Sequence, residues 1–104
     1  MANDGSFSAV VTHADGETVV RLSGELDMAT APDLAERLEQ LSSDGHAGVI
    51  IDVSELEFCD SSGLAVFVEY NQRARAHGTQ LVLRSPSPRL RVLLELTHLE
   101  ELLG

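Results

Sequence analysis

Residues 56–70 read LEFCDSSGLAVFVEY, an apolar stretch that is broken by DSSG at 60–63 and then resumes. Asp60 is typical of a helix N-cap, because its carboxylate can accept hydrogen bonds from free backbone N–H groups of the first turn. The preceding run, AGVIIDVSEL at 47–56, is short and continuously apolar. Such a run is typical of a strand buried on both faces in the middle of a sheet. The stretch therefore predicts a central strand that turns directly into a helix.

The turn at 60–63 has one structural and one functional interpretation. In the first, Asp60 caps the helix, and Cys59 and Leu64 pack around the cap as a hydrophobic staple. In the second, Ser61 stands at the first helical position and is presented to a partner for chemistry. A phosphate on Ser61 would face free backbone N–H groups and the positive end of the helix dipole, so the fold would carry it without strain.

The residues before the central strand predict a hairpin and a helix. SFSAVVTH at 6–13 and ETVVRLSG at 17–24 are joined by an Asp-Gly turn, which is typical of a β-hairpin. Thr30 followed by Asp33 resembles a capping box, and leucines then recur at helical spacing until about Gly45. We therefore expect an amphipathic helix between the hairpin and the central strand.

The residues after the turn predict two helices with a strand between them. The second helix spans about 61–77 and ends at Gly78, a residue suited to the left-handed conformation that follows a helix. TQLVLRS at 79–85 predicts a strand. Ser87 then caps the last helix, with Pro88 at its first position.

Strands that alternate with helices predict an α/β domain. We expect a mixed, mostly parallel sheet of four to five strands, opened by the N-terminal β-hairpin, with helices packed against it. The chain is the length of one domain, so we assign 1–104 to a single domain with a loose N-terminus at 1–5.

Two loops qualify as partner sites, because such sites collect at the carboxyl ends of parallel strands. They are GELDMAT at 24–30 and FCDSSG at 58–63. If their strands are adjacent and parallel, Asp27 and Thr30 lie near Ser61.

The second helix predicts a docking surface beside the turn. We expect its core stripe at Leu64, Phe67 and Val68, so Val66 and Tyr70 lean away from the core one turn apart. Isolated surface apolar residues are ordinary, but a pair beside a modifiable serine is typical of a docking surface. The predicted partner-binding residues are Asp27, Thr30, Asp60, Ser62, Gly63, Val66 and Tyr70.

The charge and cysteine content exclude several classes of partner and location. Seven arginines, no lysine and seventeen acidic residues give a formal net charge of −10, which repels nucleic acid and anionic membrane surfaces alike. The single cysteine excludes an internal disulfide, and no stretch resembles a signal peptide or a membrane span. We expect a cytoplasmic protein without a nucleic-acid or membrane partner.

No motif predicts an enzyme or a metal site. CDSSG lacks the first glycine of G-x-S-x-G, and a Walker A motif is excluded because the chain has no lysine. The histidines are scattered next to loops without ligand spacing: His13, His46, His77 and His98. Cys59 is flanked by acids and apolar residues, which predicts an inert thiol with a raised pKa. Asp52, Glu55 and Glu57 are interpreted as a solvated strand end.

Three blocks of the sequence resemble those of the STAS-domain anti-sigma factor antagonists, also called anti-anti-sigma factors. They are LSGELDMATAPDL, VIIDVSELEFCDSSGLAVFVEY and SPSPRLRVLLELTHLEELL. The resemblance covers about 19–103, and its most specific element is D-S-S-G-L after an apolar strand. G-E-L-D before a helix that starts at a threonine is the second.

The resemblance implies a partner-switching mechanism. In that family the serine after the motif aspartate, here Ser61, is phosphorylated by the anti-sigma factor, a serine kinase. Only the unphosphorylated form captures the kinase and frees the sigma factor, and a PP2C-type phosphatase restores it. ATP and Mg are used by the partner kinase, so the chain itself has no cofactor. The residue matching the family's loop aspartate, here Asp27, is implied to lie beside the serine and contact the partner.

The resemblance leaves one alternative function open. Cys59 stands where an aliphatic residue is usual, Met28 where histidine, tyrosine or a small apolar residue often occurs, and the tail after the last helix is short. None of these departures removes the serine motif. The alternative is a STAS adaptor subunit of a signalling scaffold or a transporter, without obligatory serine phosphorylation.

Overall fold

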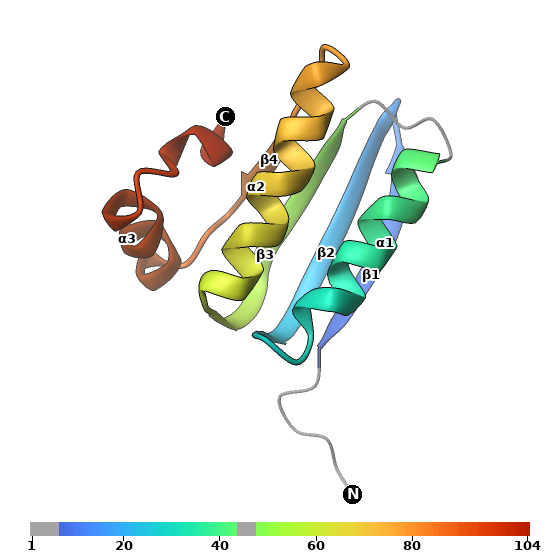
Figure 1. Cartoon of the computed structure of the whole chain (residues 1–104). Coiled ribbons are helices and arrows are strands. Elements are labelled where there is room, and N and C mark those ends of the chain that lie inside the picture. The colour runs from blue at the N-terminus through green and yellow to red at the C-terminus, as the bar shows by residue number, and fades with distance from the viewer. Residues whose placement is uncertain (1–6, 44–47) are drawn as a thin grey trace, which may run out of the picture.

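The computed structural model describes residues 7–43 and 48–104 of an α/β fold (Figure 1). Its elements are β1 Ser8–Ala14, β2 Glu17–Leu26, α1 Ala31–Ser43, β3 Val49–Cys59, α2 Ser61–Ala76, β4 Leu81–Arg84, α3 Pro88–Leu96 and the short 3₁₀ helix η1 Glu100–Leu103. Figure 1 shows α1 and α2 side by side over one face of the sheet, with α3 and η1 beyond its β4 side. The predicted loose terminus at 1–5 and the predicted helix end near Gly45 lie outside the described residues.

The sheet has four strands in the order β1-β2-β3-β4. The β1–β2 pair is antiparallel, whereas β2–β3 and β3–β4 are parallel. The hairpin turn contains Asp15 and Gly16 at φ 53 and 80, the conformation that makes Asp-Gly a frequent hairpin turn. The predicted mixed, mostly parallel sheet with an N-terminal hairpin is therefore confirmed.

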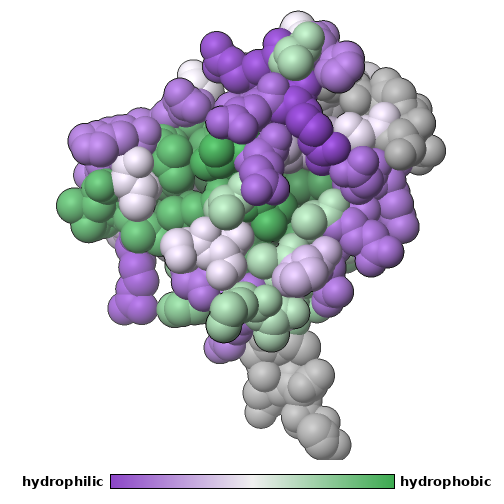
Figure 2. Space-filling model, viewed as in Figure 1, coloured by the Kyte–Doolittle hydropathy of each residue, from purple (hydrophilic) through white to green (hydrophobic). Residues whose placement is uncertain are grey.

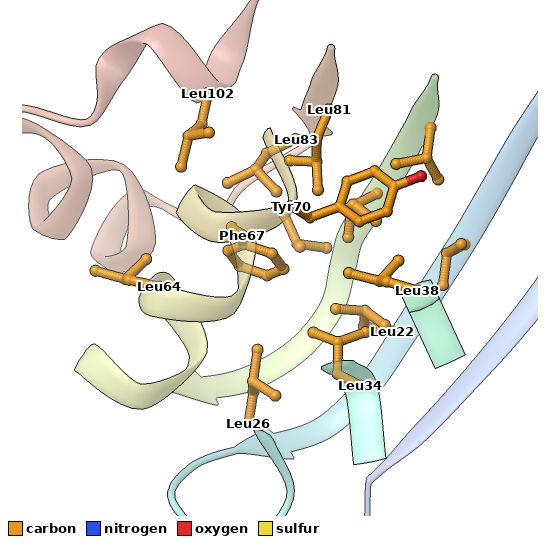
Figure 3. Packing of buried hydrophobic residues seen from close by; sticks show 14 of the residues in the cluster. Leu22, Leu26, Leu34, Leu38, Leu64, Phe67, Tyr70, Leu81, Leu83 and Leu102 are labelled. Atoms are coloured by element: carbon orange, nitrogen blue, oxygen red, sulfur yellow. The ribbon is translucent and has the colours of Figure 1, made fainter. Parts of the chain in front are cut away.

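The hydrophobic core lies between the sheet and the two covering helices (Figure 3). Alternate residues of β2 point into it, because successive strand residues face opposite sides of a sheet. Helices contribute leucines at helical spacing and the fully buried Phe67. The largest fully buried side chains are Phe67, Leu22, Leu26, Leu34, Leu38, Ile51, Leu81, Leu94, Leu102, Val20 and Val53.

The predicted solvated strand end is confirmed for Glu55 and Glu57, which are exposed, and is wrong for Asp52. Arg21, Asp52 and Arg84 pair across three adjacent strands, and Asp52 is only 8% exposed. Its Oδ2 lies 3.7 Å from Arg21 Nε and 3.8 Å from Arg84 Nη2, and its Oδ1 accepts from Ser54 N at 3.0 Å. The Ser54 backbone bond lowers the pKa of Asp52, helped by both arginines and opposed by burial. On the same face of β3 as Asp52, Ile50 is half-buried and Ser54 is exposed, so the predicted burial of this strand on both faces is only partial.

The helix ends follow the predicted capping residues. Gly78, at φ 82, comes shortly after α2, which ends at Ala76. Ser87 Oγ accepts from Leu90 N at 3.1 Å, and Pro88 opens α3. The helical segment at the C-terminus is divided in two, because α3 ends at Leu96 and η1 follows.

Candidate functional site

The two predicted loops meet at one edge of the sheet. Leu26 at the end of β2 is in register with Cys59 at the end of β3, and Asp60 N donates to Leu26 O at 3.1 Å. Because the strands are parallel and end at the same level, the loop at 27–30 and the turn at 60–63 are neighbours (Figure 1). The prediction that both loops emerge at the same edge is confirmed.

The turn at 60–63 is organised by Asp60. Its Oδ1 accepts from Ser62 N at 2.9 Å and from Gly63 N at 3.4 Å, which confirms the predicted N-cap. Its backbone is extended, with φ −109 and ψ −171, as an N-cap residue requires. Asp60 therefore fixes the direction in which α2 leaves the strand.

Ser61 is the first residue of α2 and is exposed. Within the described part of the chain, its hydroxyl makes no hydrogen bond, whereas the neighbouring cap carboxylate makes two. A serine hydroxyl at this position is accessible from outside and is not needed by the fold. The site therefore offers a free nucleophilic oxygen at the positive end of a helix.

Gly63 has a packing role that the sequence did not reveal. A Cβ on this buried residue would lie 2.6 Å from Leu26 Cγ and Cδ2 and 3.0 Å from Cys59 Sγ. Gly63 was predicted to contact a partner, but the space beside this buried residue is filled by the protein's own β2 and β3. Gly63 allows the first turn of α2 to rest on the end of that strand.

The loop at 27–30 is closed by its own hydrogen bonds. Asp27 Oδ1 accepts from Ala29 N at 2.9 Å and Thr30 N at 3.1 Å. Thr30 Oγ1 accepts from Asp27 N at 2.9 Å and donates to Glu25 O at 2.8 Å. The predicted capping box is corrected here, because the Thr30 hydroxyl turns back into the loop instead of accepting from Asp33 N.

The prediction that Tyr70 faces outward is wrong, because Tyr70 is 3% exposed. The buried residues of α2 are Gly63, Leu64, Phe67, Tyr70, Asn71 and Ala74. Asn71 is part of this stripe because its Oδ1 accepts from Leu81 N at 2.9 Å and ties the helix to β4. Figure 3 shows the Tyr70 ring among the core residues near Leu38. Val66 is half-buried.

Cys59 is the inert thiol that its neighbours predict. Burial, and to a lesser extent the neighbouring Asp60 carboxylate, raise the pKa of the Cys59 thiol to about 12. The thiol donates to Asp60 O at 3.6 Å. Because the thiolate is the reactive form, Cys59 stays unreactive near neutral pH.

Exposed apolar residues near the site were missed by the sequence analysis. Met28 in the first loop is 77% exposed, and Phe58, Val92 and Leu96 are 45%, 51% and 73% exposed. The last three line a hollow of about 330 Å³ between the end of β3 and α3. Figure 2 shows hydrophobic surface extending over this side of the molecule.

Among the described residues, no group of three or more His, Cys, Asp or Glu side chains could hold a metal ion. None of the helices described is both long and apolar enough to span a membrane.

The chain resembles known proteins along most of its length. A family model described as "Mlab, STAS domain" matches residues 9–104. The anti-sigma-B factor antagonist of Bacillus subtilis is 32% identical over 93 residues, which cover 89% of this chain and 84% of that relative. The chain belongs to the STAS-domain family of anti-sigma factor antagonists. These relatives are anti-sigma factor antagonists, which are regulatory proteins and not enzymes.

Solved structures of the STAS family have the same fold. The crystal structure of an anti-sigma factor antagonist from Mycobacterium paratuberculosis is 31% identical, with a TM-score of 0.78, and the match covers 97% of this chain and 86% of that one. SpoIIAA of Bacillus, solved in its unphosphorylated form, is 24% identical with a TM-score of 0.80, covering 90% of this chain and 84% of that one. Its phosphorylated form matches with a TM-score of 0.73 at 23% identity, covering 90% of this chain and 86% of that one.

Proposed function

We propose that this STAS protein is an anti-sigma factor antagonist switched by phosphorylation of Ser61. Its unphosphorylated form binds an anti-sigma factor serine kinase and thereby releases the sigma factor. Phosphorylation by that kinase, with ATP and Mg, ends the interaction, and a PP2C-type phosphatase restores it. The chain itself requires no cofactor. The observation that carries the proposal is the exposed Ser61 hydroxyl, which has no hydrogen bond within the described fold.

The geometry around Ser61 supports a modification that changes the surface and leaves the fold intact. Asp60, not Ser61, supplies the cap of α2, so a phosphate on Ser61 removes no hydrogen bond from the described fold. The positive end of the α2 dipole also favours a negative group at this position. SpoIIAA, which shares this fold, has been solved in a phosphorylated form. This supports the proposal that the fold accommodates a phosphate.

The same phosphate would be costly inside an interface. It adds about −1.5 to −2 charges and three acceptor oxygens at neutral pH. In a desolvated contact, repulsion and lost packing would cost several kcal/mol. A thousandfold loss of affinity corresponds to about 4 kcal/mol, which is within that range.

The proposed contact surface surrounds Ser61. The loop at 27–30 presents Asp27 and Thr30 next to the turn, and Ser62 and Val66 continue the surface along α2. Asp60 and Gly63 support this surface by shaping the turn. Tyr70 is buried and is no longer part of the proposed surface.

Phosphorylation assays with purified anti-sigma factor kinases encoded in the same genome test the proposal. We expect one of them, with ATP and Mg, to add one phosphate to Ser61, located by phosphopeptide mapping. Ser61→Ala should bind that kinase constitutively, and Ser61→Glu should bind it weakly, as measured by calorimetry. Ser62→Ala tests the assignment of the site, because it removes the adjacent hydroxyl and should still receive one phosphate. Ser42→Ala, on the exposed side of α1 and outside the proposed surface, is the control that should be phosphorylated and released like wild type.

Phosphate found on Ser62 alone, or equal affinities of the Ser61 variants, would overturn the proposal. A stable complex with a scaffold or transporter component that is indifferent to all Ser61 variants would instead favour the adaptor function.

A further inference from the structure

The strands β3 and β4 differ in length, and this leaves part of β3 without a neighbour. β3 has 11 residues and β4 has 4. Pairing between them covers only Val49–Asp52 of β3, whereas β2 pairs with β3 as far as Cys59. Along Val53–Cys59, β3 therefore has a strand on one side only. Such an edge presents backbone N–H and C=O groups that another strand can pair with.

An apolar groove runs along this free edge. Four consecutive residues of β3, Leu56–Cys59, line it. Because alternate strand residues point to opposite faces, consecutive lining residues place the groove beside the strand edge and not over one face. The opposite wall is α3, with Leu90, Leu93 and Leu96. The groove thus combines unpaired strand backbone with apolar side chains.

We propose that this groove, bounded by 56–59 of β3 and by α3, docks an extended segment of the anti-sigma factor, which pairs as a strand with the free edge of β3. This proposal rests on the proposed function and gives the partner a second contact beside Ser61. Addition of an extended peptide to a sheet edge is a frequent mode of recognition, in which the backbone gives affinity and alternate side chains enter pockets. The segment should therefore carry apolar residues at alternate positions, with basic residues next to them.

Because the groove adjoins the turn at 60–63, its expected occupant is the same partner that recognises Ser61. Cys59 lines the groove and is followed directly by Asp60 and Ser61, so one partner can cover both places. The exposed Phe58 and Val92 stand on opposite walls of the groove and offer apolar contact area.

Charge disfavours a second copy of this chain as the occupant. Each copy carries a formal net charge of −10, so two copies repel each other, although the groove itself is lined by one acid, Glu57, and one base, Arg89. Glu57 on the edge strand also opposes pairing with an identical edge. A partner segment with lysines or arginines is attracted by the net negative charge of the chain and associates faster at low salt.

A matched pair of valine variants tests the proposal. Val92 in the groove is 51% exposed, and Val10 on the distant strand β1 is 55% exposed. We expect Val92→Asp to raise the Kd for the purified kinase at least about tenfold, chiefly through a faster dissociation rate, because buried apolar anchors dominate interfaces. Val10→Asp should bind like wild type. Surface plasmon resonance measures both, after circular dichroism has shown that both are folded. Equal affinities of the two variants would overturn the proposal.

Amide exchange measured by NMR in the complex tests the strand pairing itself. One edge of a strand presents the N–H groups of alternate residues, so added protection should have a period of two along 54–59. We expect these alternate amides to exchange at least about tenfold more slowly when the kinase is bound. Unchanged exchange along 54–59 in a saturated complex would overturn strand addition.

The two proposals fail in different ways. Val92→Asp should raise the KM for phosphorylation of Ser61 and leave kcat unchanged, because the groove binds the partner at a distance from the hydroxyl. Wild-type protein that binds the kinase but is not phosphorylated overturns the switch alone. Normal wild-type phosphorylation with identical KM values for Val92→Asp and Val10→Asp overturns the groove alone. Dimers of the free protein that Val92→Asp dissociates would assign the groove to a second copy.

Discussion

The loop at 27–30 and the turn at 60–63 stand side by side, yet they use their polar groups differently. Each has an aspartate whose Oδ1 accepts two backbone N–H groups. In the loop, the hydroxyl of Thr30 is also used, because it bonds to Asp27 N and Glu25 O. In the turn, the hydroxyl of Ser61 has no bond within the described structure. A polar residue at a partner surface is therefore available to the partner only where the fold has not already used it.

This difference separates effects on stability from effects on binding. Substitutions of the bonded residues should change the free energy of unfolding, whereas substitutions of Ser61 should act on the partner alone.

The largest change is expected for Gly63→Ala, at about 1–3 kcal/mol of lost stability, because the added methyl overlaps Leu26 and Cys59 in a packed core. At an open helical position the same substitution would stabilise the protein by about 1 kcal/mol, since alanine is the better helix former. A loss of stability would therefore indicate a packing clash, whereas a gain would indicate that helix propensity dominates. Urea unfolding monitored by circular dichroism measures it, and a more stable variant would contradict the close approach of α2 to β2.

A smaller change is expected in the loop. Asp27→Ala removes the acceptor for Ala29 N and Thr30 N and should cost about 1–2 kcal/mol, whereas Asp27→Asn keeps an acceptor oxygen and should cost less. Thr30→Val keeps the shape of the side chain but loses two hydrogen bonds, at about 1 kcal/mol.

Met28→Ala is the control for the loop, because Met28 is 77% exposed and takes no part in the two bonds accepted by Asp27 Oδ1. It should unfold like wild type in the same urea titration. An Asp27→Ala variant as stable as Met28→Ala would show that the loop bonds contribute nothing, and the contrast with the turn would be lost.

Local signals in the sequence predicted the order of the elements and the geometry of the turn. Asp60, Ser87 and Gly78 act within a few residues of their own position, so capping rules identify them without knowledge of the tertiary structure. The Asp-Gly hairpin and the shared edge of the two loops follow in the same way from strand patterns and parallel pairing.

Features that depend on packing between distant segments were not predicted. The core stripe of α2 was predicted at Leu64, Phe67 and Val68, which placed Tyr70 outside. The buried stripe instead continues from Phe67 through Tyr70, Asn71 and Ala74. The bond from Leu81 N to Asn71 forms only after β4 docks beside α2. Asp52 likewise becomes buried because arginines on two other strands lie opposite it.

The groove beside β3 was not predicted, because the sequence patterns gave other bounds for the two strands. The apolar runs predicted strands at 47–56 and 79–85, whereas β3 continues to Cys59 and β4 covers only Leu81–Arg84. The free edge follows from this difference, since adjacent parallel strands of such unequal length leave part of the longer one unpaired.

The smallest change is expected for Ser61→Ala, within about 0.5 kcal/mol of wild type in urea unfolding, because Ser61 is exposed and Asp60 provides the cap. Asp60→Ala is the matched comparison, since it removes the bonds to Ser62 N and Gly63 N and should cost about 1 kcal/mol. The adjacent residues would then have opposite profiles: Ser61→Ala keeps stability and loses the phosphorylation switch, whereas Asp60→Ala loses stability. A Ser61→Ala variant destabilised as much as Asp60→Ala would mean that the fold uses this hydroxyl, and the reason for assigning it to the partner would disappear.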